Sequence, residues 1–155
     1  MTGARIGAGL LVFLLLVAGA ALFGVRFQPG SWYAGLVKPA WTPPNALFGP
    51  VWSVLYLGIA VAGWLVWRRG GAGAPPLVFW AGQLVLNALW SWLFFGLHRP
   101  LWALCDIVLL WAAALAFAAA AWGASRLAGV LFVPYLVWVA YAAALNAALW
   151  RLNRG

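Results

Sequence analysis

Residues 76–99 are PLVFWAGQLVLNALWSWLFFGLHR, with no lysine, arginine, aspartate or glutamate before the final arginine. An apolar stretch of roughly twenty residues is long enough to cross the hydrocarbon core of a bilayer as a helix. Four more apolar stretches occupy most of the chain, so the predicted spans cover about residues 6–25, 45–67, 76–97, 101–122 and 127–150. The sequence therefore predicts an all-α membrane protein, a single domain over residues 1–155 built as a five-helix transmembrane bundle.

The composition excludes an ordinary soluble domain. Of the 155 residues, 68% are hydrophobic and 6% are charged, and the mean hydropathy is +1.02; a soluble domain has roughly a quarter charged residues. The net charge is +8, but the basic residues stand singly or in pairs at the ends of apolar runs, where they meet lipid headgroups. We therefore expect no nucleic-acid partner. With a single cysteine, Cys105, and no His/Cys cluster, we also expect no metal site.

The charges leave the orientation open. An odd number of spans puts the two termini on opposite sides of the membrane, and the basic residues divide four against five, which gives no usable positive-inside bias. We expect an integral multi-pass protein, with both the inner and the outer bacterial membrane as candidate locations. The two groups of basic residues are Arg5, Arg68, Arg69 and Arg126 on one side, and Arg26, Lys38, Arg99, Arg151 and Arg154 on the other.

The connection over residues 26–44 is much longer than the others and contains SWYAGLVKPAWTPP (residues 31–44). Its prolines stiffen the backbone, and we expect Thr42 to cap the second span. Two interpretations stay open from physics alone: an ordered lid over one end of the bundle, or an aromatic belt at headgroup depth. The predicted lid residues are Trp32, Lys38, Pro39, Trp41, Pro43 and Pro44.

Polar side chains inside three of the spans share helix faces with tryptophans. Gln83, Asn87 and Ser91 recur every four residues in the third span. Amides of this kind either join helices, at about 0.6 kcal/mol each, or line a ligand cavity; their recurrence beside aromatic residues in three spans favours a cavity. The companions in the other spans are Trp52, Ser53 and Tyr56 in the second, and Tyr135, Trp138, Ala142 and Asn146 in the fifth.

Other residues give weaker indications of a functional site. Asp106, the only acid, is expected near the membrane interface, paired with an arginine or a backbone group, because a charge at mid-bilayer costs about 2.5–3.5 kcal/mol. No catalytic set of carboxylates, Ser/His/Asp or Cys/His residues is present. A ridge of alanines at four-residue spacing permits close helix approach, within the bundle or across a dimer. These alanines are Ala112, Ala116, Ala120 and Ala124.

Four segments together resemble one known family. They are WYAGLVKPAWTPP (residues 32–44), GPVWSVLY (49–56), GQLVLNALWSWLFFG (82–96) and VPYLVWVAYAAALN (133–146). In this order they look like the signature segments of the translocator protein family, called tryptophan-rich sensory protein (TspO) in bacteria and formerly peripheral-type benzodiazepine receptor in animals. The resemblance runs from about residue 31 to residue 146 and is to the bacterial-type members.

The resemblance implies a five-helix bundle whose ordered first loop covers a ligand pocket. It also implies an integral membrane receptor or carrier for tetrapyrroles, such as protoporphyrin IX and haem, and for related flat hydrophobic ligands, with a further role in stress regulation. No obligatory cofactor is implied, since porphyrin or haem would be the ligand. Carried onto matching positions, the ligand-binding residues are Tyr33, Trp52, Gln83, Asn87, Trp90, Trp138 and Ala142.

The family also suggests an alternative and two kinds of partner. The alternative is a light-dependent porphyrin-degrading enzyme, in which Trp52 and Trp138 would be the photoreactive residues. Besides porphyrins, the expected partners are membrane lipid and a second copy of the chain in a homodimer. Cholesterol is not expected at the end of the fifth span, because Ala147 and Ala148 stand where animal relatives carry a tyrosine of a cholesterol motif.

Overall fold

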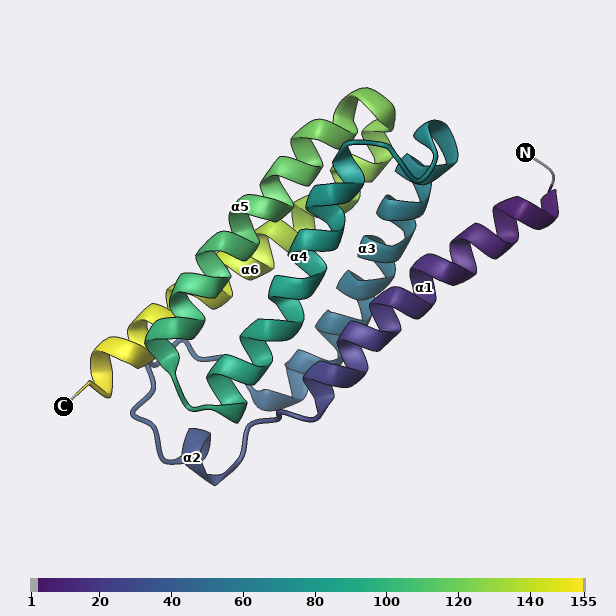
Figure 1. Cartoon of the computed structure of the whole chain (residues 1–155). Coiled ribbons are helices and arrows are strands. Elements are labelled where there is room, and N and C mark those ends of the chain that lie inside the picture. The colour runs from purple at the N-terminus through teal and green to yellow at the C-terminus, as the bar shows by residue number, and fades with distance from the viewer. Residues whose placement is uncertain (1–2, 155) are drawn as a thin grey trace.

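The computed structural model describes residues 3–154, and it consists of helices joined by mostly short connections (Figure 1). Within residues 3–154, five helices are long and apolar enough to cross a membrane, which confirms the predicted five-span bundle. The elements in chain order are α1 (Gly3–Val25), α2 (Ser31–Ala34), the 3₁₀ turn η1 (Asn45–Leu47), α3 (Phe48–Gly70), α4 (Pro76–Ser91), the π-helical turn η2 (Trp92–Gly96), α5 (Pro100–Ala124) and α6 (Arg126–Leu152).

The helix ends follow local sequence signals, with one correction. Pro76 and Pro100 occupy first helical positions, where a missing N–H costs nothing, and Gly71 ends α3 with φ +71. The Ser125 side chain accepts from the Ala128 N–H and caps α6. The prediction that Thr42 caps the second span is wrong: its hydroxyl donates to the Pro39 carbonyl, 2.8 Å away, because the chain turns before the helix begins.

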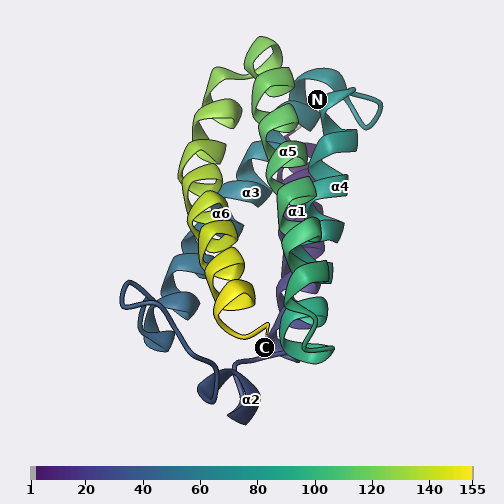
Figure 2. The same cartoon turned by 90° about the vertical axis from the view of Figure 1, so that its left-hand side faces the viewer.

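The five spans form a closed ring. The main helix contacts are α1 with α3, α3 with α6, α6 with α5, α5 with α4, and α4 with α1. Helices α3 and α4 are joined by a short connection but touch only slightly, because α1 lies against both of them. The N-terminal end of α1 and the α5–α6 turn lie at one end of the bundle, and the chain's C-terminus lies at the other (Figures 1 and 2).

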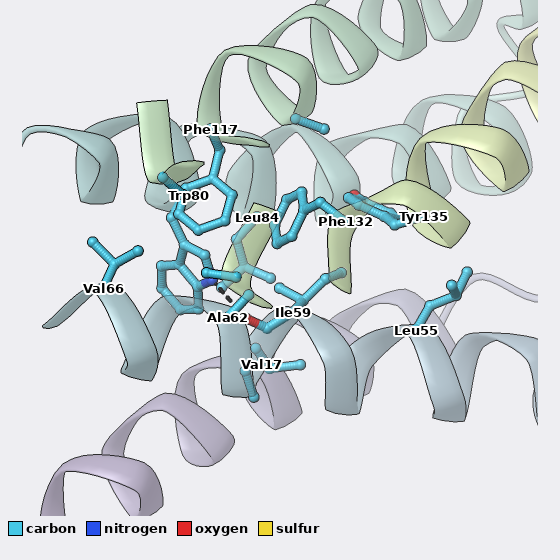
Figure 3. Packing of buried hydrophobic residues seen from close by; sticks show 14 of the residues in the cluster. Val17, Leu55, Ile59, Ala62, Val66, Trp80, Leu84, Phe117, Phe132 and Tyr135 are labelled. Atoms are coloured by element: carbon cyan, nitrogen blue, oxygen red, sulfur yellow. Dashed lines mark hydrogen bonds between the residues drawn. The ribbon is translucent and has the colours of Figure 1, made fainter. Parts of the chain in front are cut away.

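The middle of the bundle and its end near the α5–α6 turn are filled with apolar side chains (Figure 3). Trp80 of α4 crosses to α3, where its indole N–H donates to the Ile59 carbonyl at 2.8 Å. Phe117 of α5 meets Phe132 of α6 with ring centroids 4.3 Å apart. Alanines with no exposed surface let the helices approach closely around these rings. They are Ala60, Ala62, Ala114, Ala121 and Ala128.

The long first connection folds over the opposite end, beside the C-terminus (Figures 1 and 2). Asn153, just past α6, exchanges two 2.9 Å hydrogen bonds with the backbone of Val37. The Tyr141 hydroxyl of α6 donates to the Trp41 carbonyl at 2.6 Å. Because its backbone is tied to α6 at two separate points, the loop is an ordered part of the bundle, as the sequence predicts.

Candidate ligand-binding site

A cavity of about 450 Å³ opens at the loop end of the bundle. It lies where the C-terminal end of α1, the start of the first connection, the beginning of α3 and the end of α4 with η2 come together. Its volume falls in the range of about 300–1,000 Å³ that small-molecule sites occupy. Its aromatic lining residues are Phe27, Phe48, Trp52, Tyr56, Trp90 and Phe95, and its polar ones are Gln28, Asn45, Ser53 and Ser91.

The aromatic side chains of the cavity wall are held by contacts with nearby residues of their own helix and, at Trp90, of α6. Trp52 lies beside Tyr56 one turn later on α3, with ring centroids 5.1 Å apart. Trp90 lies 5.7 Å from Phe95 in an edge-to-face arrangement, and its indole N–H donates to the Asn146 side chain of α6 at 3.1 Å. These contacts fix the ring planes before any ligand arrives, which lowers the ordering cost of binding.

A chain of hydrogen bonds runs from the cavity wall into the bundle interior. The Tyr56 hydroxyl donates to Asn87 Oδ1 at 2.8 Å, and Asn87 Nδ2 donates to the Tyr135 hydroxyl at 3.0 Å. Tyr135 then donates to Gln83 Oε1 at 2.8 Å, and Gln83 Nε2 donates to the Trp80 carbonyl at 3.0 Å. Three helices, α3, α4 and α6, are joined by this chain.

A second, much smaller hollow of about 20 Å³ lies next to the cavity and shares Phe48, Trp90 and Phe95 with it. Tyr33 of the loop and Ala142 of α6 line this hollow. Tyr33 is only 3% exposed; burial raises the pKa of its phenol, and nearby Tyr141 adds to the effect. Tyr33 therefore stays neutral at physiological pH.

The structure brings some of the predicted ligand-binding residues together and separates others. Trp52 and Trp90 line the 450 Å³ cavity, and Trp90 reaches the small hollow lined by Tyr33 and Ala142. Gln83 and Asn87 line neither space, because they lie behind Tyr56 in the hydrogen-bonded chain.

Trp138 also lines neither space, although it packs against Phe48, which lines both. It packs against Phe48 and Tyr141, with ring centroids 6.1 and 5.8 Å away. Its indole nitrogen is buried and has no hydrogen-bond partner within residues 3–154. The assignment of Trp138, Gln83 and Asn87 to ligand contacts stays a prediction.

The predicted lid residues close the end of the bundle around Tyr33. Trp32 stacks on His98 at 4.3 Å between ring centroids, and Trp41 meets Tyr141 at 5.6 Å. Lys38 Nζ lies 4.8 Å from the centre of the Tyr33 ring and donates to the Ala34 and Leu36 carbonyls. Pro39 accepts the Thr42 hydroxyl, and Pro43 and Pro44 lead into η1.

The part of the connection that lines the large cavity is Phe27, Gln28 and Pro29, which the sequence analysis did not select. These three residues follow α1 directly. A β-carbon on Gly96 of η2 would lie 2.8 Å from the Phe27 ring, so η2 and the start of the connection fit closely at this glycine. No periodic pattern in the sequence marks residues of an irregular segment such as this one.

Asp106 corrects an expectation. The expectation that it pairs with an arginine or a backbone group is wrong: Asp106 is 5% exposed within the bundle, and neither carboxylate oxygen has a hydrogen-bond partner in the described part of the chain. The reason is its position on the helix: Ala103 and Leu110, three residues before and four after it, are both buried and share its inward face. Its expected place near the membrane interface stays a prediction.

The fold and the cavity define a helical, multi-pass membrane protein with a candidate small-ligand site beside the start of its first connection. The chain belongs to the TspO/MBR family, whose sequence model matches residues 10–151. It is 41% identical over 147 residues to Protein CrtK of Rhodobacter capsulatus, which covers 93% of this chain and 92% of the relative. It is also 41% identical over 150 residues to the human Translocator protein, with 92% of this chain and 89% of the relative covered.

A third relative is the Tryptophan-rich sensory protein of Cereibacter sphaeroides, which is 40% identical over 146 residues, with 92% of this chain and 90% of the relative covered. The match therefore extends over nearly all of both chains in each case. This confirms the resemblance that the four signature segments indicate, and with the five spans it makes the chain an integral, multi-pass membrane protein.

Proposed function

We propose that this protein is a membrane receptor or carrier for flat, largely apolar ligands of the tetrapyrrole type, such as protoporphyrin IX or haem. The observation that carries the proposal is the 450 Å³ cavity with aromatic walls at the loop end of the bundle. Much of the lining is aromatic, and a planar ring system can stack on or meet the edges of such rings.

The cavity also matches the two kinds of surface that a porphyrin carries. Trp52, Trp90 and Phe95 offer aromatic faces and edges, each worth about 0.5–1.5 kcal/mol per aromatic pair beyond area burial. Gln28 and Asn45 bring amide groups to the lining, and both are solvent-exposed. Arg26 precedes this lining segment and is exposed, so it can meet the carboxylates on one edge of the ring.

The proposed test is a fluorescence-quenching titration of the detergent-solubilised protein with protoporphyrin IX. Trp52→Ala should weaken binding about threefold to tenfold, the equivalent of one lost aromatic contact. Trp102→Ala is the matched control, because Trp102 is 66% exposed at the outer surface of α5. Absence of saturable quenching, or equal affinities of the two variants, would contradict the proposal.

Illumination of the protein–porphyrin complex distinguishes a receptor or carrier from a porphyrin-degrading enzyme. Under illumination in air, a receptor or carrier leaves the porphyrin absorbance of the bound complex at the level of a protein-free control. Accelerated loss of that absorbance, abolished by Trp52→Ala, would instead support consumption of the ligand.

A further inference from the structure

The direction of the interior hydrogen-bonded chain is set by one backbone group. The Trp80 carbonyl can only accept, so the group of Gln83 that faces it at 3.0 Å must be the amide nitrogen. Gln83 Oε1 therefore faces Tyr135, and since a carbonyl oxygen can only accept, the Tyr135 hydroxyl must donate to it. The opposite placement of the Gln83 amide would bring two carbonyl oxygens together.

The same logic carries the direction to the cavity wall. Tyr135 has one proton, and because that proton goes to Gln83, its oxygen must accept from Asn87 Nδ2. Asn87 Oδ1 is then the group that faces Tyr56, at 2.8 Å, and Tyr56 must donate its only hydroxyl proton to it. Gln83, Tyr135 and Asn87 are 0%, 0% and 4% exposed, so water does not compete for these bonds.

We infer that Tyr56 meets a ligand in the 450 Å³ cavity only as a hydrogen-bond acceptor. Among flat apolar molecules, the protein therefore binds those with an N–H or O–H donor on the edge facing Tyr56 more tightly than those without one, and a tetrapyrrole, whose carboxylates only accept, turns a different edge toward Tyr56. Tyr56 lines the cavity, and with its proton committed to Asn87 its oxygen has only lone pairs left. Gln83 acts as a positioning residue that sets this preference without touching either cavity. The inference rests on the proposed function, because it requires that the cavity bind a flat ligand.

A second hydroxyl group on α3 also presents a hydrogen-bond acceptor to the cavity. Ser53, three residues before Tyr56, also lines the cavity, and its hydroxyl donates to the Gly49 carbonyl of its own helix at 2.9 Å. In this arrangement the Ser53 oxygen presents lone pairs on the same face of α3 as the Tyr56 oxygen, and because Ser53 is exposed its hydroxyl can also turn to other partners. A ligand edge with only acceptors would leave both oxygens without a partner and lose the hydration they had in the empty cavity.

The test uses a set of flat fluorescent probes that differ in one group: pyrene, 1-hydroxypyrene, 1-methoxypyrene and pyrene-1-carboxaldehyde. In the unmodified protein, 1-hydroxypyrene should bind about threefold to tenfold more tightly than 1-methoxypyrene, the gain expected from one net hydrogen bond. Tyr56→Phe should bring this ratio close to one. Pyrene, which has no polar group, reports any change in the shape of the cavity, so the affinities of the substituted pyrenes are compared with that of pyrene within each protein.

Gln83→Leu provides the sharper test, because it removes the group that sets the direction. The Asn87 amide can then turn over, so that Tyr135 donates to Asn87 Oδ1 and Asn87 Nδ2 donates to Tyr56. The Tyr56 O–H is then free to donate a hydrogen bond to a ligand in the cavity. Pyrene-1-carboxaldehyde, an acceptor, should bind this variant more tightly than the unmodified protein, while pyrene affinity stays constant. A role of Gln83 in stability alone would not reverse the preference.

The possible results decide between the two proposals. If pyrene and protoporphyrin IX both fail to bind, the proposed function is wrong and the inference falls with it. If both bind but the unmodified protein shows no preference for 1-hydroxypyrene, or Tyr56→Phe keeps the preference, the inference alone is wrong. If Gln83→Leu does not fold, Tyr56→Phe still decides.

Discussion

The two ends of the bundle are built from the same five helices, yet they are filled in opposite ways. Near the α5–α6 turn, buried alanines bring the helices together around Phe117 and Phe132 (Figure 3). At the loop end, aromatic side chains of α3, α4 and η2 line a 450 Å³ cavity instead of filling the space beside α1. Because the same five helices make both regions, neither helix number nor helix length decides where such a bundle is hollow.

The largest expected loss of stability comes from creating a cavity in the closely packed end of the bundle. Phe132→Ala removes a ring with no exposed surface from contacts with Phe117 and Tyr135, and we expect it to lower the free energy of unfolding by about 3–5 kcal/mol. Trp52→Ala enlarges a space that already exists and should cost less. Thermal unfolding of both variants in one detergent measures the difference; equal losses would contradict the contrast between the two ends.

A smaller effect is expected from adding one carbon to the closed region. A β-carbon on Gly63 would lie 2.5 Å from Trp80 Nε1 and 2.8 Å from Phe13, so Gly63→Ala must displace the indole that donates to the Ile59 carbonyl. Overpacking of this kind costs about 1–3 kcal/mol.

The control for this substitution is Gly82→Ala on α4, where a β-carbon meets nothing within 4 Å. Alanine is favoured over glycine in a helix by about 1 kcal/mol, so this variant should be as stable as the unmodified protein or more so. Thermal midpoints measured side by side compare the two. A loss of similar size in Gly82→Ala would show that helix glycines matter for a reason other than close contact with Trp80.

The smallest expected loss of stability comes from a substitution that affects the first connection. Tyr141→Phe removes the hydrogen bond to the Trp41 carbonyl, at a cost of about 0.5–1.5 kcal/mol, toward the lower end at this exposed site. Amide hydrogen exchange should rise in residues 38–44, while the pair formed by Val37 and Asn153 stays intact. Faster exchange in the α5–α6 turn, or no change in the loop, would contradict the assignment of Tyr141 as a local tether.

Much of the fold was predictable because it depends on local sequence. Long apolar runs with charges at their ends define the spans, and the predicted limits lie within three residues of the observed ones, as at Gly70 and Leu152. The ordered loop was predictable from its prolines and its apolar side chains, which would be costly to leave in water. The shared helix face of Gln83 and Asn87 follows from four-residue spacing alone.

The candidate site was predictable only in part. Trp52 and Trp90 do line the large cavity, but spacing could not show that the amides behind them bind one another instead of facing open space. The same limit explains Asp106: the sequence suggested a partner for its carboxylate, whereas the rotation of α5 turns the carboxylate inward. The cavity residues Phe27 and Gln28 lie in an irregular segment, where no periodic pattern exists to be read.

By itself, the sequence determined the five spans, the ordered first connection and the family, because length, hydropathy, proline placement and helical periodicity are properties of contiguous segments. Only the tertiary structure decided the order of the helices around the ring, the hollow end, and the hydrogen-bond direction that reaches Tyr56 from the Trp80 carbonyl. These features depend on how each helix is rotated against neighbours that are distant in the chain, and that rotation is fixed by the packing of all five helices together.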